Sequence, residues 1–205
     1  MTAYPPEPWH LAGQAHVSVW LLPAGSLPAM PDHIEPVIVG AHAVVVTAWV
    51  DYRPPGQLSY HELLAAVAVR GGLGASILDI WVDSEVSLRG GRELWGIPKD
   101  LATLEFTDDR SSATGREFKA LGEDDWIAGA AFARRAGLPL ALPARFQVAQ
   151  MLDERLVRSP VAARAKLHAA AADWSINPDG PLGYLAGRRP IVSAVLRDFT
   201  LVFGS

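Results

Sequence analysis

Most of the chain divides into short apolar segments separated by turn-forming residues. Six segments alternate apolar and polar positions or are rich in valine, threonine and aromatic residues, a pattern that predicts β-strands. They are residues 16–22, 37–52, 76–82, 101–107, 146–152 and 191–203. Residues 116–120 and 126–135 predict a further hairpin, with the polar residues 122–125 as its turn. The pattern therefore predicts a mainly β protein.

Not every segment is predicted to be a strand, because some contain prolines and two others are ambiguous. Residues 23–36 contain four prolines and predict a loop, and residues 138–143 predict a connector between strands. The polar residues 108–114 predict a turn. Residues 60–70 fit either a helix or a buried strand, and the alanine-rich residues 161–174 favour a helix by propensity alone.

One short helix is predicted in the middle of the chain. Asp83 or Ser84 can cap its first turn, where Glu85 is also favourable. The helix is expected to run to about Arg89, because the glycine pair at residues 90–91 is typical of a helix end.

Composition indicates one globular domain over residues 1–205. Half of the chain is hydrophobic and 20% is charged, which is ample for a packed core. The formal net charge is −4 without blocks of like charge, so we expect neither a nucleic-acid nor a membrane partner. Cysteine is absent, and we see neither a signal peptide nor an apolar run that spans a bilayer. A cytoplasmic protein is the expectation.

The sequence contains no common cofactor motif. Phosphate-loop, dinucleotide and nucleophile-elbow patterns are missing, and the six histidines lack the spacing of metal ligands. We therefore expect no metal and no cofactor.

Residues 91–100 are the candidate site of chemistry. They place Lys99 directly after a proline and close to Leu94, Trp95 and Ile97, although the chain contains few lysines among its 18 basic residues. Burial in an apolar setting disfavours the charged ammonium, and lysine, unlike arginine, can then act as a free amine. The alternative is an ordinary solvated lysine in a turn.

The segment around Lys99 resembles the acetoacetate decarboxylase family. The residues that carry this resemblance are Gly91-Arg92-Glu93, Pro98-Lys99 and Leu101. Further likeness is seen at Tyr4-Pro5-Pro6 with Pro8-Trp9, at Ser59-Tyr60-His61-Glu62, and at Ala165-Lys166-Leu167 leading to Trp174. The likeness spans most of the chain, and the lysine motif is its specific part.

The resemblance implies an α+β fold that is mainly β. Its antiparallel sheet is curled into a cone, or partly closed barrel, with a few short helices packed against it. It also implies strands at residues 60–70 and 161–174, against helix propensity in the second case. Because the family tends to assemble, a homo-oligomer is expected.

The resemblance also implies chemistry at Lys99. Family members form a Schiff base between this lysine and a keto acid, and an iminium is the electron sink that a β-keto acid needs to lose CO2. Apolar surroundings or a neighbouring cation activate such a lysine, and acetoacetate decarboxylase is itself the established example of this activation. Glu62 is the implied acid/base partner, and its structural alternative is an ion pair with Arg53 or Arg70.

Five residues are candidates for binding the substrate. They are Trp20, Leu21, Tyr60, Arg92 and Trp95. Decarboxylating members carry an arginine for the substrate carboxylate near the position of Leu21, and leucine cannot replace it. Arg53 or Arg92 could bind a carboxylate from elsewhere.

Asp100 is a second departure, because decarboxylating members have another lysine there. An anion beside Lys99 would favour the charged ammonium. If the segment is extended, however, Asp100 points to the opposite face.

Three alternatives for the function therefore remain. The protein could be a β-keto acid decarboxylase, or another Schiff-base enzyme such as an aldolase-dehydratase on a keto acid. The third alternative is a non-catalytic pocket for a carbonyl compound.

Overall fold

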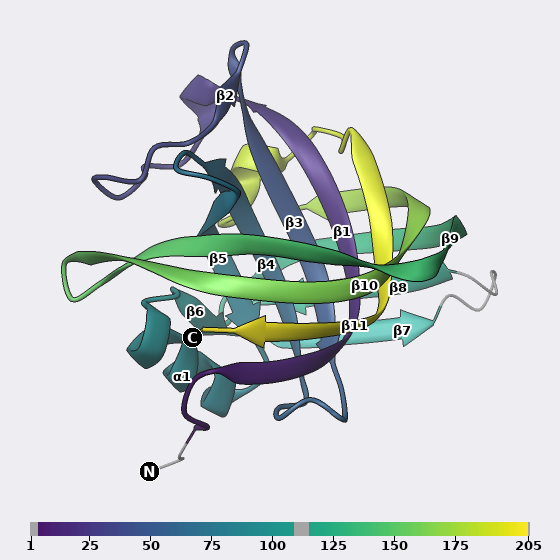
Figure 1. Ribbon diagram of the computed structural model, residues 1–205. Coiled ribbons are helices and arrows are strands. Elements are labelled where there is room, and N and C mark those ends of the chain that lie inside the picture. The colour runs from purple at the N-terminus through teal and green to yellow at the C-terminus, as the bar shows by residue number, and fades with distance from the viewer. Residues whose placement is uncertain (1–3, 109–114, 205) are drawn as a thin grey trace.

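The strands and the helix lie in residues 4–108 and 115–204, which the computed structural model describes (Figure 1). In chain order the strands are β1 (Trp9–Pro23), β2 (Ile38–Val39), β3 (His42–Tyr52), β4 (Tyr60–Val69), β5 (Gly74–Val82), β6 (Lys99–Leu101), β7 (Thr103–Asp108), β8 (Gly115–Leu121), β9 (Trp126–Leu152), β10 (Arg155–Ile176) and β11 (Val192–Phe203). The α-helix of these ranges is α1 (Glu85–Trp95), and two short 3-10 helices are η1 (Ala24–Ser26) and η2 (Gly183–Leu185). Most of the turn predicted at residues 108–114 falls outside the described residues.

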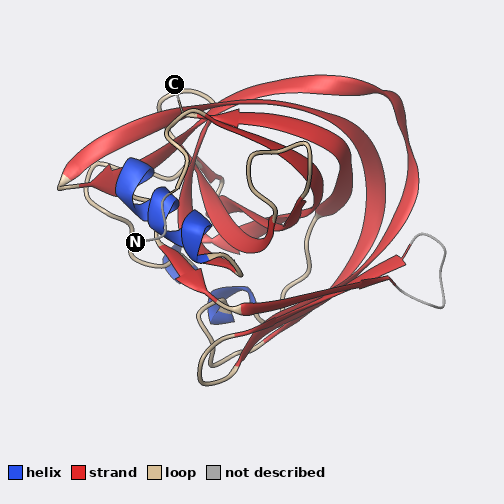
Figure 2. Cartoon of the chain, turned by 90° about the horizontal axis from the view of Figure 1, so that it is seen from below, coloured by secondary structure: helices blue, strands red, loops and turns tan. Residues whose placement is uncertain are grey.

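Within the described residues the strands form one sheet in the order β6-β5-β4-β3-β1-β11-β10-β9-β8-β7, with β2 added to β3. A second, parallel pairing joins β5 to β9, where Gly74 lies opposite Gln147 and Ala75 opposite Val148. This pairing connects β5, β4, β3, β1, β11, β10 and β9 into a ring of strands (Figure 2). The predicted fold, a mainly β sheet that is curled and partly closed, is confirmed.

The two faces of the ring strands carry different side chains, because successive residues of a strand point to opposite sides. On β3, Val50 and Tyr52 belong to a core cluster inside the ring. Trp49 points the other way and stacks on Phe118, with ring centroids 5.3 Å apart. Phe118 and Phe132 belong to β8 and β9, which form a second layer over the outer face. The fold therefore has one core inside the ring and another between the two layers.

The helix α1 begins where expected but extends further. The side chain of Ser84 accepts a hydrogen bond from the first turn, as predicted for a capping residue. The prediction that Gly90 and Gly91 end the helix is wrong, because the helix continues to Trp95 and is closed by Gly96, which has a left-handed φ of 65°. A Cβ at Gly90 would lie 2.4 Å from the indole of Trp9. This glycine thus permits close packing rather than a helix end.

The connector predicted at residues 138–143 is also wrong, since these residues lie inside the long strand β9. This part of β9 pairs with β10, and Pro143 lies opposite Arg164. Its other side is an edge among the described residues, because the pairing with β8 stops at Ala133 and the pairing with β5 starts at Gln147. Proline is tolerated on a strand edge, where no ladder hydrogen bond is lost.

Both ambiguous segments are strands, in agreement with the family resemblance and against the helix propensity of residues 161–174. Residues 60–69 form β4, and β10 pairs with β9 on one side and β11 on the other. Ala170 and Ala172 pack against the aromatic cluster between the two layers. Pairing along both edges outweighs the weak preference of alanine for helix.

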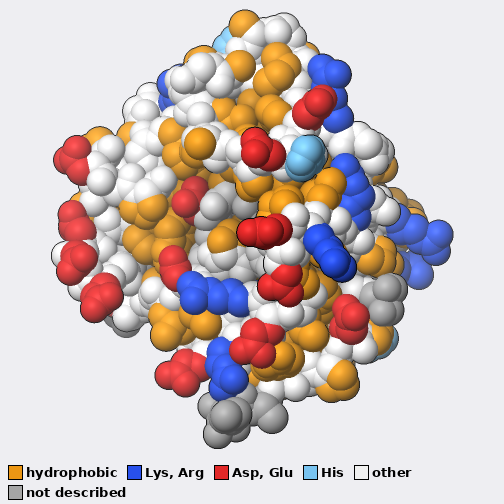
Figure 3. All heavy atoms as spheres, turned by 90° about the vertical axis from the view of Figure 1, so that its left-hand side faces the viewer, with side chains coloured by type: hydrophobic (Ala, Val, Ile, Leu, Met, Phe, Trp, Pro, Cys, Tyr) orange, Lys and Arg blue, Asp and Glu red, His pale blue; other side chains and the backbone are white. Residues whose placement is uncertain are grey.

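The sequence contains no blocks of like charge, and the surface of the molecule agrees with this. Figure 3 shows acidic and basic side chains scattered among apolar ones on one face of the molecule. The described ranges contain no helix of the length and apolar character needed to cross a membrane.

Candidate active site

Lys99 begins β6, a short strand that pairs in parallel with β5 beside Ile80. Its side chain is buried, with only 4% of the residue exposed. The Nζ atom donates hydrogen bonds to Glu62 Oε2 at 2.8 Å and to Ser87 Oγ at 2.9 Å. The hydroxyl of Tyr60 lies 3.4 Å from the same nitrogen. Lys99 is therefore held at a defined point inside the protein.

The helix α1 makes room for this lysine. A Cβ at Gly91 would lie 2.8 Å from both Cδ and Cε of Lys99, so the aliphatic part of the lysine packs directly on the helix backbone. Ser87 lies in the first turn of the same helix, three residues after the cap Ser84, and it is fully buried. The cap thus places the hydroxyl that accepts a hydrogen bond from Lys99.

Glu62 is the carboxylate of the site, and 3% of it is exposed. It lies on β4 and accepts hydrogen bonds from Lys99, from Tyr52 at 3.2 Å and from Tyr60 at 3.4 Å. Burial, followed by the nearby charge of Glu62, raises the pKa of Tyr52 and of Tyr60 well above the usual value. Both phenols therefore stay protonated and donate toward the carboxylate.

A cavity of about 490 Å³ inside the ring contains Lys99 and Glu62. Its walls come from the inner faces of the ring strands and are almost entirely apolar, with residues such as Val50, Leu64 and Phe199. Lys99 and Glu62 are the two ionisable groups, apart from tyrosines, among the described residues that line it. The volume and the lining suit a small organic ligand with a few polar atoms.

The family model for acetoacetate decarboxylase (ADC) matches residues 3–120, which is more than half of the chain and includes every hydrogen-bonding partner of Lys99. The chain belongs to the acetoacetate decarboxylase family. None of the curated proteins compared with this sequence matches it.

Several solved structures share the fold of this acetoacetate decarboxylase-family chain. An acetoacetate decarboxylase from Legionella pneumophila is 16% identical, with a TM-score of 0.73 over 100% of this chain and 88% of the other. The enduracididine biosynthesis enzyme MppR is 17% identical, with a TM-score of 0.70 over 98% and 87% of the two chains. An acetoacetate decarboxylase-like enzyme from Sphingomonas wittichii RW1 is 14% identical, with a TM-score of 0.65 over 98% and 92%. At these identities the likeness shows the fold.

The structure brings four of the sequence-predicted site residues together. Lys99, Glu62, Tyr60 and Trp95 all line the apolar cavity. Glu62 lies 37 residues before Lys99 in the chain, and the pairing of β4 with β5 and of β5 with β6 brings the two side chains within hydrogen-bonding distance.

Trp20 and Leu21, however, do not line this cavity, so the prediction that they contact its ligand is not supported by the geometry. Trp20 is buried on the other face of β1 and donates a hydrogen bond to Thr47 Oγ1 at 2.9 Å. Leu21 lies near the far end of the strand and is 41% exposed. The strand β1 starts at Trp9, earlier than the sequence predicted. The residues that line the cavity therefore lie mainly in the first half of the strand, and alternation turns Trp20 to the other face.

Arg92 also lies outside the cavity. Its Nε donates to the main-chain oxygen of Lys99 at 2.6 Å, and its guanidinium pairs with the exposed carboxylate of Asp100. Arg92 therefore holds the backbone of the lysine motif. The prediction that Asp100 points away from the amine is confirmed. Arg53 pairs with Asp51 and does not reach the cavity either.

Sequence reasoning missed Tyr52 and Ser87, which contact Glu62 and Lys99 directly. Tyr52 is the last residue of β3 and pairs with Tyr60 across the strands, a register that could be inferred only from the pairing. The sequence offers no indication that Ser87 belongs to the site, apart from its position three residues after the helix cap. Within residues 4–108 and 115–204, no three His, Cys, Asp or Glu side chains gather as a metal site requires.

Proposed function

We propose that this protein is a Schiff-base-forming lyase that acts on a β-keto acid through Lys99. The observation that carries this proposal is the buried Lys99 Nζ, which lies 2.8 Å from Glu62 at the wall of an apolar cavity. Membership of the acetoacetate decarboxylase family supports it. A proton passed across this distance from Lys99 to Glu62 leaves the free amine that attacks a carbonyl.

The reaction then needs few other groups. The amine adds to the ketone carbon, and the ketone oxygen leaves as water, which forms a protonated imine. Cleavage of the bond to the carboxylate releases CO2 and leaves the electron pair in an enamine. Protonation of the enamine carbon and hydrolysis of the imine release the ketone and restore Lys99. In this scheme Glu62 supplies and accepts the protons.

Tyr52, Tyr60 and Ser87 position these two groups. Because their pKa values are raised, the two tyrosines remain hydrogen-bond donors and hold the Glu62 carboxylate in place. Ser87 Oγ accepts from Lys99 and fixes the direction of its nitrogen. Such fixed partners reduce the reorganisation needed when charge moves during the reaction.

The cavity walls favour a substrate whose remainder is apolar. No arginine is among the described residues that line the cavity, so the protonated imine formed on Lys99 is the cation available to a carboxylate there. Loss of CO2 removes the negative charge from these apolar surroundings. Each further methylene buried contributes about 0.8 kcal/mol, or about fourfold in kcat/KM. We therefore propose β-keto acids with longer apolar chains than acetoacetate.

A second candidate is a Schiff-base enzyme that does not decarboxylate, such as an aldolase-dehydratase. The absence of an arginine from the described lining residues favours it, because none of them provides a fixed guanidinium for the carboxylate that is lost. MppR shares the fold and has been crystallised with pyruvate and with the condensation product of pyruvate and imidazole 4-carboxaldehyde. A non-catalytic pocket for an apolar carbonyl compound is the third.

Borohydride trapping separates these candidates. The protein is incubated with acetoacetate, pyruvate, a 3-oxo acid of eight carbons or the matching methyl ketone, then reduced and mapped by mass spectrometry. We expect an adduct on Lys99 with the longer 3-oxo acid and release of CO2. Lys99→Arg should abolish the adduct, whereas Lys119→Arg, at an exposed lysine, should keep it.

Each other outcome contradicts a part of the proposal. An adduct on Lys99 without CO2 identifies the second candidate. Binding of the ketone without any adduct identifies the non-catalytic pocket. Equal efficiency with acetoacetate and the longer acid refutes the proposed chain-length preference.

A further inference from the structure

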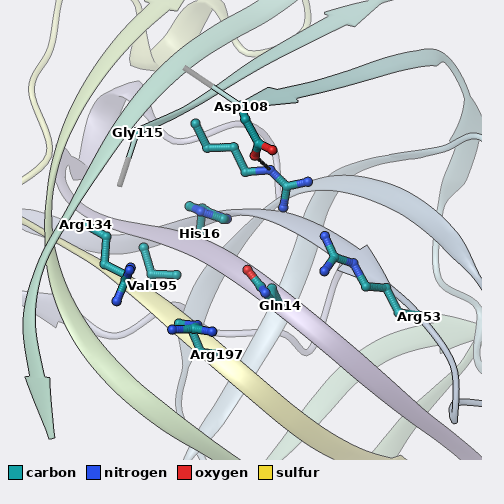
Figure 4. Close-up of a pocket in the computed structure, with 9 residues that line it drawn as sticks. Gln14, His16, Arg53, Asp108, Gly115, Arg134, Val195 and Arg197 are labelled. Carbon is teal, nitrogen blue, oxygen red and sulfur yellow. Dashed lines mark ion pairs between the residues drawn. The ribbon is translucent and has the colours of Figure 1, made fainter. Parts of the chain in front are cut away.

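A second pocket, of about 290 Å³, lies on the other face of the same strands. On β1, Ala15 lines the apolar cavity and its neighbour His16 lines this pocket. On β11, Leu196 faces the apolar cavity and Arg197 faces this pocket. Figure 4 shows Arg134 to the left of His16, Arg197 below it and Arg53 to the lower right. The two pockets are therefore separated by one layer of backbone.

Four arginines surround this second pocket, which we call the arginine pocket. They are Arg53, Arg116, Arg134 and Arg197. The first two pair with the buried carboxylate of Asp51, and Arg116 also lies 3.5 Å from Asp108. Arg134 and Arg197 form no ion pair with any carboxylate of the described ranges. Among the described lining residues the arginines outnumber the carboxylates, and the nearby Asp198 offsets part of the charge of Arg197.

One buried polar atom of the arginine pocket also lacks a hydrogen-bond partner. It is Nδ1 of His16, a residue only 4% exposed, whereas Nε of Arg116 faces Asp108 Oδ1 at 3.5 Å. A buried polar group without a partner costs about 1–3 kcal/mol, and native structures contain few of them. Burial, followed by the charge of Arg116, lowers the pKa of His16 to about 4, so its ring is neutral near pH 7. A neutral imidazole carries one N–H and one acceptor nitrogen, and the guanidinium groups of the pocket offer further N–H groups to an oxygen atom.

We propose that the arginine pocket binds a phosphate group, either as inorganic phosphate or as the phosphoryl group of a small molecule. Guanidinium groups bind the oxygens of phosphate in a bidentate manner, and several of them match its double charge better than the single charge of a carboxylate. The volume is at the lower end for ligand pockets, which suits a small anion rather than a large cofactor. This site stands independently of Lys99 and of the proposed lyase activity.

Titration calorimetry of the whole protein tests this site. The probes are inorganic phosphate, phenyl phosphate and acetate at equal ionic strength, since salt screens weak attraction to exposed charges. We expect saturable binding of a phosphate probe and much weaker binding of acetate. Tighter binding of inorganic phosphate assigns the free ion, and tighter binding of phenyl phosphate assigns a phosphoryl group on a larger molecule.

Two double variants with the same change in net charge provide the comparison. Arg134→Gln with Arg197→Gln should raise the Kd for phosphate at least about 100-fold, because two charge-assisted contacts are lost. Arg155→Gln with Arg189→Gln changes exposed arginines that do not line the pocket and should leave the Kd unchanged. Circular dichroism checks that both variants fold.

The imidazole of His16 supplies a second readout. In ¹H–¹⁵N spectra its resonances should shift on addition of phosphate to the wild type, and this shift should vanish in the Arg134/Arg197 variant. The proposal is overturned if neither phosphate probe saturates, if acetate binds equally well, or if both double variants lose affinity to the same extent.

Discussion

The apolar cavity and the arginine pocket lie back to back on β1 and β11, yet their charged groups are held in different ways. In the apolar cavity, Lys99 and Glu62 are both buried and depend on each other. Beside the arginine pocket, the buried carboxylate of Asp51 pairs with Arg53, whose side chain is 44% exposed, and with Arg116, whose side chain is 17% exposed. Strand alternation lets one stretch of sequence serve two chemical environments. The exposure of each charge to water then decides how much it contributes to the stability of the fold.

The difference has an energetic consequence. Removal of one partner of a buried ion pair leaves a charge without compensation and is strongly unfavourable, whereas exposed pairs contribute about 0–1 kcal/mol. Substitutions in the apolar cavity should therefore have large effects on the reaction. Substitutions at the rim of the arginine pocket should have small effects on stability.

Glu62→Gln should have the largest effect. The amide retains the shape of Glu62 but cannot accept a proton from Lys99, so the rate of adduct formation should fall by about 10²–10⁴. Borohydride trapping over time measures this rate, and Glu117→Gln, at an exposed carboxylate, is the matched control. Retention of the wild-type rate in Glu62→Gln would exclude Glu62 as the acid/base group.

The buried histidine of the arginine pocket should make stability depend on pH. The pKa of His16 is lowered from 6.5 to about 4 by burial, then by Arg116, with a further contribution from Arg53 that Asp51 opposes. The unfolded chain therefore binds more protons than the folded one between these values. The stabilisation is complete above pH 6.5 and declines toward pH 4, by about 3 kcal/mol at most.

Urea denaturation at several pH values checks this dependence. His16→Gln should flatten the decline between pH 6.5 and 4, whereas His10→Gln, at an exposed histidine, should not. Asp108, Arg134 and Arg197 face the same pocket and remain in both variants. An identical slope in the wild type and His16→Gln would show that His16 is not responsible.

Gly91→Ala should impair the reaction more than the stability. The added Cβ would meet Cδ and Cε of Lys99 at 2.8 Å and displace its flexible side chain. A displacement of about 1 Å can lower a rate by about 100-fold. Alanine improves helix propensity by about 1 kcal/mol, so the thermal midpoint should change little. Gly25→Ala, where no atom lies within 4 Å of the added Cβ, is the control. A wild-type trapping rate in Gly91→Ala would refute this packing role.

Arg53→Gln should have the smallest effect. Its guanidinium is partly exposed, and Asp51 retains Arg116, whose Nη1 lies 3.1 Å from its Oδ2. The free energy of unfolding should fall by about 1 kcal/mol or less, as measured by urea denaturation. A loss as large as that of a broken buried pair would remove the contrast between the two pockets.

Sequence reasoning identified the lysine motif more reliably than the residues around it. Lys99 stood out because a lysine among apolar residues follows a recognisable motif, and Glu62 followed from the family resemblance. Trp20 and Leu21 were misplaced because the starting point of β1, and hence which of its residues face the cavity, does not follow from local alternation. The glycines of α1 were misread as a helix end, and the proline-containing part of β9 was misread as a connector. Whether a helix or a strand tolerates such residues depends on the segments that pack against it or pair with it.

The sequence by itself determined most of the strands, the cap at Ser84 and the position of the lysine motif, because each depends on residues close together in the chain. Only the tertiary structure decided that Glu62, Ser87 and Lys99 meet, since strand pairing brings distant residues together. It also decided that β5 and β9 close the ring. Closure separates the apolar cavity inside the ring from the outer face, where the arginine pocket lies beside the core between the two layers.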